Sequence, residues 1–161
     1  MSVKAGDAAA CAPGGDLVRV AIGSLSLVLP EQDVDSVESV LDMNRAGAGD
    51  GPACGHLALA GASCPVYALS ERLDLVRTVE PRGRVCIVIA AEAGPMAVLA
   101  DAASRLDAAG VRRCALPACM RTGGGLLLGL AVVDSAPLFE VSGASLGAWL
   151  TRTVAEPAAI A

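Results

Sequence analysis

The stretch GHLALAGASCPVYALSERL, residues 55–73, constrains the fold of this chain more than any other. Apolar residues alternate with small or polar ones on both sides of a Gly61-Ala62 turn, which is the pattern of a β-hairpin. The second strand opens on Pro65, and because proline cannot donate a hydrogen bond to a sheet, it favours a sheet edge or a strand start. A short amphipathic turn, Ser70 to Leu73, follows. Since an isolated hairpin is marginally stable in water, the rest of the chain must build a sheet around this one.

A second hairpin is predicted at residues 17–30, LVRVAIGSLSLVLP. Its two strands meet at Gly23-Ser24, and glycine at the first central position suits a type II′ turn, because that position requires a positive φ. The segment 31–43 is ambiguous, since its valines fit helical spacing but β-branched residues also suit a strand. Residues 46–55 have the composition of a loop.

The second half of the chain begins at Arg84 and is also rich in strand patterns. We expect, in order, a strand at 85–91, a turn from Glu92 to Pro95, a strand segment at 96–106, a loop at 120–125, a strand pair at 126–141 and a helix at 142–152. Ser142 is the expected N-cap of that helix. Leu146, Trp149 and Leu150 form its apolar stripe.

These short strands, separated by turns at nearly regular spacing, predict a mainly β protein with two small barrels side by side. At 161 residues the chain suits one domain, or two very small ones that share a core. We expect a disordered tail at 1–15, a domain at 16–152 and a tail at 153–161. Within the domain, one subdomain spans about 16–75 and the other about 84–141, with a linker around Pro81-Arg82-Gly83 between them.

The composition argues against a nucleic-acid partner. Aromatic residues make up 2% of the chain, so there are few platforms on which bases could stack. The net charge of −5 comes entirely from residues 1–50, which hold eight acidic and three basic residues. A phosphate backbone would be repelled by this part and not attracted by the rest.

The sequence also predicts no membrane insertion. Its longest apolar runs, 85–91 and 126–133, are far shorter than the roughly 20 residues that a helix needs to cross a bilayer. The first fifteen residues lack the apolar core of a signal peptide. We therefore expect a cytoplasmic protein whose six cysteines are reduced thiols.

No catalytic, cofactor or metal site is predicted. His56, the only histidine, follows Cys54 by two residues, and such neighbours seldom form the aligned pair that nucleophilic catalysis needs. Cys114 and Cys119 are separated by four residues, one of them a proline, and the second close pair that a structural zinc site needs is missing. The glycine-rich loops lack the Lys-[Ser/Thr] of a phosphate loop. A thiol- or metal-dependent sensor or enzyme that uses Cys54 and His56 remains an alternative.

Several motifs keep a characteristic order over about residues 17–150. They are LSLVLP with Val34 and Val37, then Gly55-x-Leu57-x-Leu59-x-Gly61-x₃-Pro65-Val66-x₂-Leu69, the apolar strand 85–90, the segment Val98 to Asp101, and Gly129. In this order and spacing the chain resembles the chemotaxis coupling protein (CheW) family, which builds scaffolds and not enzymes.

The resemblance implies two SH3-like five-stranded barrels around a shared core, no cofactor, and a cytoplasmic adaptor. Such an adaptor links the cytoplasmic tips of chemoreceptors to the regulatory domain of a histidine kinase. The receptor surface would involve Val34, Val37, Leu57, Leu59, Gly61 and Ser63. The kinase surface would lie on the second barrel, at Leu99, Ala100 and Asp101.

Three positions depart from the family pattern. Ala60 stands where the family has an arginine, Ser36 where it has an acidic residue, and Ala68 where it has an aspartate. If the first two form an ion pair in the family, losing both ends avoids an unpaired charge. A divergent barrel domain that binds a non-receptor protein is therefore a further alternative.

Overall fold

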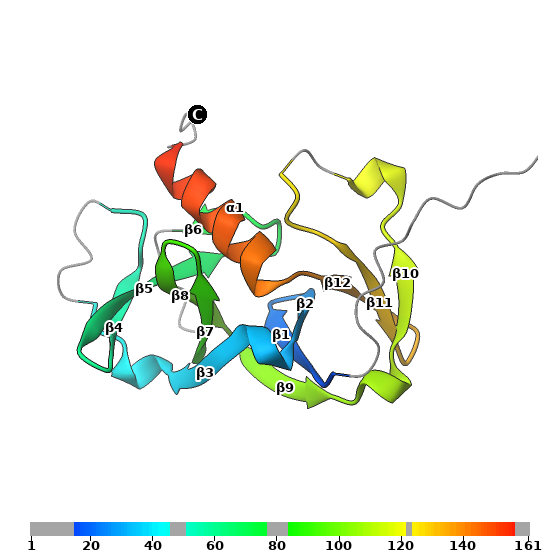
Figure 1. Cartoon of the computed structure of the whole chain (residues 1–161), viewed down its shortest axis with the longest axis horizontal. Coiled ribbons are helices and arrows are strands. Elements are labelled where there is room, and N and C mark those ends of the chain that lie inside the picture. The colour runs from blue at the N-terminus through cyan, green and yellow to red at the C-terminus, as the bar shows by residue number, and fades with distance from the viewer. Residues whose placement is uncertain (1–14, 46–50, 77–83, 122–123, 157–161) are drawn as a thin grey trace, which may run out of the picture.

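A computed structural model describes residues 15–45, 51–76, 84–121 and 124–156. Two β-sheets lie side by side, with one helix, α1 (Gly143–Ala155), across them (Figure 1). Sheet A has the order β10 (Arg112–Ala115), β11 (Gly129–Val133), β12 (Ala136–Glu140), β2 (Leu25–Pro30), β1 (Leu17–Ile22) and β9 (Ala102–Leu106). Sheet B has the order β3 (Val34–Ser39), β7 (Val85–Ala91), β8 (Gly94–Ala100), β5 (Ala62–Leu69) and β4 (Gly55–Leu59), with β6 (Leu75–Val76) paired to β5. The predicted mainly β fold with two small barrels and a C-terminal helix is confirmed.

Each sheet combines strands from both halves of the chain. The β1–β2 hairpin lies between β9 and β12 in sheet A, and the β7–β8 hairpin lies between β3 and β5 in sheet B. Each hairpin pairs antiparallel on one side and parallel on the other. The two sheets therefore do not coincide with the segments 16–75 and 84–141. The hairpin β1–β2 from the first segment lies in sheet A among strands of the second, and the hairpin β7–β8 from the second lies in sheet B among strands of the first. Alternation along a strand shows that one face is buried, but it does not show which strand lies beside it.

The turns follow the expected chemistry, with one shift. Ile22 pairs with Leu25, so Gly23 and Ser24 form the predicted two-residue turn, and Gly23 has a φ of +56°. In the second hairpin Leu59 pairs with Ala62, so the turn consists of Ala60 and Gly61 and not of Gly61 and Ala62. Both residues have positive φ, +45° and +82°, as a type I′ turn requires.

The ambiguous segment 31–43 is a strand between two tight turns. The 3₁₀ turns η1 (Glu31–Asp33) and η2 (Val40–Asp42) flank β3. Asn44 then pairs with His56 through two backbone hydrogen bonds of 2.8 and 2.9 Å. This pair connects the end of the β3 segment to β4 and closes the barrel of sheet B.

Each sheet has six strands, one more than the five expected, through β6 in sheet B and β10 in sheet A. The edge strand β10 of sheet A, with the sequence Arg-Arg-Cys-Ala, is exposed throughout. Its sequence lacks the apolar alternation by which a strand could have been predicted. Two further 3₁₀ turns, η3 (Ala108–Gly110) and η4 (Ala118–Met120), flank this strand. Arg113 forms an ion pair of 3.4 Å with Glu140 of β12, which is buried, and this contact holds the edge strand to the sheet.

The core consists of three clusters of buried side chains. A central cluster between the sheets joins β1, β2, β5, β7 and β8 to the helix residues Leu146 and Leu150. Sheet B encloses a second cluster, which includes Cys54, Cys64 and Cys86. Sheet A encloses a small third one of Leu17, Val28, Ala131 and Leu138. Strands such as β7 are buried on both faces, since alternate residues enter different clusters.

The helix α1 starts as predicted and continues three residues further than expected. The Ser142 hydroxyl accepts a hydrogen bond from the Ser145 N–H, and the Ser145 hydroxyl accepts one from the Ser142 N–H, which together form a capping box. The N–H of Gly143 donates to the carboxylate of Asp33 at 2.8 Å. Residues 153–155, assigned to a tail, belong to this helix. Among the described residues, the structure has no helix that is long and apolar enough to span a membrane.

Five predicted segments lie partly or wholly outside the described residues. They are most of the tail 1–15, part of the loop 46–55, the linker at 81–83, part of the loop 120–125 and part of the tail 153–161. The bounds of the domain therefore stay a prediction.

Candidate docking surface

The residues predicted to bind the receptor lie on β3 and on the β4–β5 hairpin, all in sheet B. Val37, Gly61 and Ser63 are exposed. Val34 is half-buried against the central cluster, and Leu59 is half-buried against the cluster inside sheet B. These residues can form the outer part of a docking surface.

Three of the predicted contact residues have buried side chains. Leu57 and Leu99 belong to the cluster inside sheet B, and Ala100 belongs to the central cluster. A side chain in one of these positions packs in the core beneath the strands and is not exposed to a partner. The family resemblance could not reveal this, because strands buried on both faces look alike in an apolar sequence.

The predicted kinase residues also lie in sheet B, and not in a separate second barrel. Leu99 and Ala100 end β8, which pairs with β5 of the predicted receptor hairpin. Asp101 follows directly, before β9 of sheet A begins. Its carboxylate accepts a hydrogen bond of 2.7 Å from the N–H of Gly23. Asp101 therefore has a structural role at the junction of the two sheets.

Asp101 is one of two carboxylates that fasten the tip of the β1–β2 hairpin. Glu71, which follows β5, accepts hydrogen bonds from the N–H and the hydroxyl of Ser24, both at 2.9 Å. Gly23 has no side chain to obstruct this contact, and a Cβ there would lie 1.9 Å from the Glu71 carboxylate. We name this arrangement the hairpin clamp, since it ties the tip of a sheet A hairpin to residues that follow sheet B strands.

The tip of the β4–β5 hairpin is open by contrast. A Cβ added to Gly61 would meet no atom within 4 Å, and Ala60 and Ser63 are exposed. This tip is therefore free to contact a partner without displacing another part of the described chain.

The cysteines of sheet B are buried thiols and not reactive groups. Burial raises the pKa of Cys54 and Cys64, and it raises the pKa of Cys86 to about 11. The Cys54 thiol donates to the carbonyl of Val66 at 3.3 Å. A thiol in this state stays protonated at neutral pH and is a poor nucleophile. This argues against a catalytic role for Cys54 beside His56.

The candidate metal ligands are not gathered at one place. Cys114 and Cys119 are exposed beside sheet A, whereas Cys54 and Cys64 are buried in sheet B. Among the residues that the structure describes, no three His, Cys, Asp or Glu side chains are arranged to hold a metal ion.

Two features of this region have no counterpart in the sequence-based predictions. Leu41, in η2, has 89% of its surface exposed. The hairpin clamp was also not predicted, since Gly23, Glu71 and Asp101 are far apart along the chain. A single exposed leucine in a tight turn produces no periodic signal, and long-range polar contacts produce none either.

Comparison with known proteins gives two findings. The family model of the CheW-like domain matches residues 16–134. The crystal structure of the scaffolding protein TtCheW from Thermoanaerobacter tengcongensis is similar, with a TM-score of 0.61 and 15% sequence identity over 80% of this chain and 88% of that one. At this identity the likeness shows the fold alone. No match was found among curated proteins.

Proposed function

Because the chain belongs to the CheW-like domain family, we propose that it is a non-catalytic cytoplasmic adaptor of a chemosensory system. In this proposal it couples the cytoplasmic tips of chemoreceptors to the regulatory domain of a histidine kinase. The family match carries the proposal, since it spans strands of both sheets.

The exposed part of sheet B is the proposed receptor surface. Val37, Gly61 and Ser63 offer side chains or backbone to a receptor helix, while Val34 and Leu59 form its half-buried floor. Leu57 keeps this floor in place from inside the barrel. Because the open hairpin tip has no charged side chain, contact there rests on apolar area and shape.

The proposed kinase surface surrounds the end of β8. Leu99 and Ala100 are buried, so they act by holding the strand and not by touching the kinase. Asp101 fixes the neighbouring hairpin tip through the clamp. The surface presented to the kinase is then the outside of this junction.

A second candidate function is a barrel domain that binds a non-receptor protein. Ala60 at the hairpin tip and the buried Ala68 favour it, since the family's charged residues are missing at both positions. This candidate uses the same open tip for a different partner.

Binding measurements with the receptor and kinase fragments test the proposal. The cytoplasmic fragment of a chemoreceptor and the regulatory domain of the kinase, both from the same organism, are titrated with the protein in a calorimeter. We expect both to bind. Ser63→Asp should weaken receptor binding about 30-fold, since it places an unpaired charge in the contact.

Ser104→Asp is the matched control, because Ser104 is exposed on β9 of sheet A. It should leave both affinities unchanged at an equal melting temperature. If neither fragment binds the wild-type protein, the adaptor proposal fails and the second candidate is favoured.

A further inference from the structure

We propose that a ridge on β3 and η2, formed by Asp35, Val37, Glu38, Leu41 and Asp42, anchors the receptor and selects its sequence. We name it the β3 ridge. It fits a receptor segment whose apolar side chains are flanked by lysine or arginine. This inference rests on the proposed function, and it adds the anchor residue and the charge of the partner.

Leu41 is the centre of the β3 ridge. Among the described residues, three large apolar side chains are markedly exposed, and two of them lie here, Leu41 at 89% and Val37 at 48%. The third, Leu128 at 54%, precedes β11 of sheet A. Single exposed leucines are common, but here two of the three exposed apolar side chains lie within five residues of the chain, Val37 near the end of β3 and Leu41 in η2.

The backbone holds Leu41 in a fixed position. Its N–H donates to the Ser39 hydroxyl at 3.2 Å. On either side the chain is tied down, because the Val40 N–H donates to the Arg84 carbonyl at 3.1 Å and the Met43 side chain is buried inside sheet B. Val40 also packs against that cluster. The backbone of this turn is therefore ordered before a partner arrives, so binding at Leu41 costs little backbone entropy, which favours an interface anchor.

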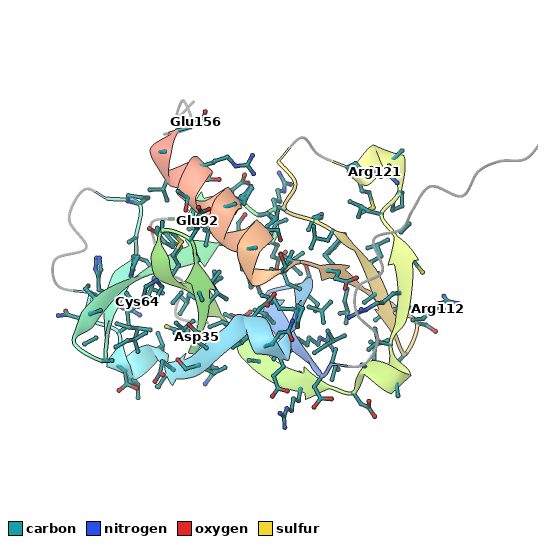
Figure 2. All side chains as sticks on the ribbon, viewed as in Figure 1. Asp35, Cys64, Glu92, Arg112, Arg121 and Glu156 are labelled. Carbon is teal, nitrogen blue, oxygen red and sulfur yellow. The ribbon has the colours of Figure 1, made fainter. Side chains whose placement is uncertain are left out.

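The segment that carries Leu41 is acidic. Residues 31–44 contain five acidic side chains and no basic one. Two of them have internal roles, since Glu31 pairs with Arg105 and Asp33 accepts from the helix N-terminus. Within the described residues, Asp35, Glu38 and Asp42 have no hydrogen bond or ion pair to their carboxylates. Asp35, which Figure 2 labels at β3, is exposed.

Unpaired carboxylates around an apolar anchor favour a basic partner. They attract lysine and arginine on approach, and they repel phosphate groups of nucleic acids or lipids. The β3 ridge is continuous with the proposed receptor surface through Val37, which belongs to both. A receptor segment that reaches Leu41 would therefore meet the hairpin tip as well.

Calorimetric titration with the receptor fragment tests this inference. We expect Leu41→Ala to weaken binding about 10-fold and Leu41→Asp more strongly. Leu128→Asp is the matched control and should change the affinity less than two-fold. Because Leu41 is exposed, all three variants should melt close to the wild-type temperature, which is checked first. The triple variant Asp35→Asn, Glu38→Gln, Asp42→Asn should bind with a weaker dependence on salt concentration.

The outcomes separate this inference from the proposed function. If the wild type binds the receptor fragment and the Leu41 variants bind equally well, the inference is overturned and the adaptor proposal stands. If Leu128→Asp weakens binding as much as Leu41→Asp, the anchor is assigned wrongly and the inference is also overturned. If the wild type binds neither fragment, both fail together.

Discussion

The two barrels have the same order of strand pairings but differ in how their hairpin tips are held. In sheet A the order is β9-β1-β2-β12-β11-β10, and in sheet B it is β3-β7-β8-β5-β4, with Asn44 in the place that β10 occupies. The tip of the sheet A hairpin β1–β2 is clamped by two carboxylates, whereas the tip of β4–β5 in sheet B is open. The comparison indicates that the first tip fixes the two barrels together and the second is available to partners.

The interiors of the barrels differ as well. Sheet B encloses three buried thiols, while the described cysteines next to sheet A, Cys114 and Cys119, are exposed. Figure 2 shows Cys64 and Arg112 at opposite ends of the molecule. The same residue type is therefore a packing group in one barrel and a surface group beside the other.

Substitution of the glycine in each tip gives the largest expected contrast. Gly23→Ala should lower the free energy of unfolding by about 2–4 kcal/mol, because the new Cβ displaces Glu71 from Ser24 and alanine is strained at positive φ. Gly61→Ala, in open space, should cost about 1 kcal/mol from the backbone strain alone. Urea denaturation measures both, and equal losses would mean that the clamp contributes nothing.

Removal of a clamp carboxylate should have a smaller effect. Asp101→Ala leaves the Gly23 N–H without its charged acceptor, at a cost of about 1–2 kcal/mol. The control is Asp35→Ala in sheet B, whose carboxylate has no partner among the described residues and which should change stability by less than about 0.5 kcal/mol. Thermal denaturation of Asp101→Ala and Asp35→Ala measures the two losses of stability. A neutral Asp101→Ala would show that Glu71 alone holds the tip.

The buried thiols predict a loss of stability at alkaline pH. The pKa of Cys86 is raised by burial from its usual value near 9.0 to about 11, so the unfolded chain loses this proton at a lower pH than the folded one. The contribution of the protonated Cys86 thiol to the free energy of unfolding is complete below pH 9 and is lost as the pH rises toward 11. Denaturation of the wild type and of Cys86→Ala at several pH values measures this contribution as the difference between the two proteins.

The exposed cysteines provide the control for this comparison. Cys114 and Cys119 should react with an alkylating reagent at neutral pH, while Cys54, Cys64 and Cys86 should react after unfolding. Rapid labelling of all five in the folded protein would contradict the buried positions of the sheet B thiols.

Local elements could be predicted from the sequence because their signals are local. The hairpin at 17–30 depends on Gly23, whose positive φ a two-residue turn requires, and the helix start depends on Ser142. The strand pairing depends on contacts between distant segments. Nothing in the alternation of β1 and β2 shows that they join β9 and β12 and not β3.

The candidate site was predictable only in outline. The family resemblance led to sheet B, but it could not separate exposed Val37 and Ser63 from buried Leu57 and Leu99, since a motif match does not show which face of a strand is covered. In the sequence, the carboxylates near Leu41 are part of the general acidic excess of residues 1–50, and Leu41 has no distinguishing pattern. Their arrangement depends on η2, a turn of three residues that has no distinct sequence pattern.

The smallest effect concerns the open tip itself. Ala60 has a φ of +45°, a conformation that costs a residue with a Cβ about 1 kcal/mol and costs glycine almost nothing. Ala60→Gly should therefore stabilise the protein by up to about 0.5 kcal/mol, since the greater freedom of glycine in the unfolded chain offsets part of the gain.

Ala60→Arg, which restores the residue that the family resemblance places here, keeps the backbone strain at this position and should leave the stability unchanged. Because the tip is open, any change in receptor affinity in Ala60→Arg then reports on contact with the partner and not on folding. Thermal denaturation and calorimetric titration of both variants measure the two effects separately, and a large loss of stability in Ala60→Arg would show that the tip is not open.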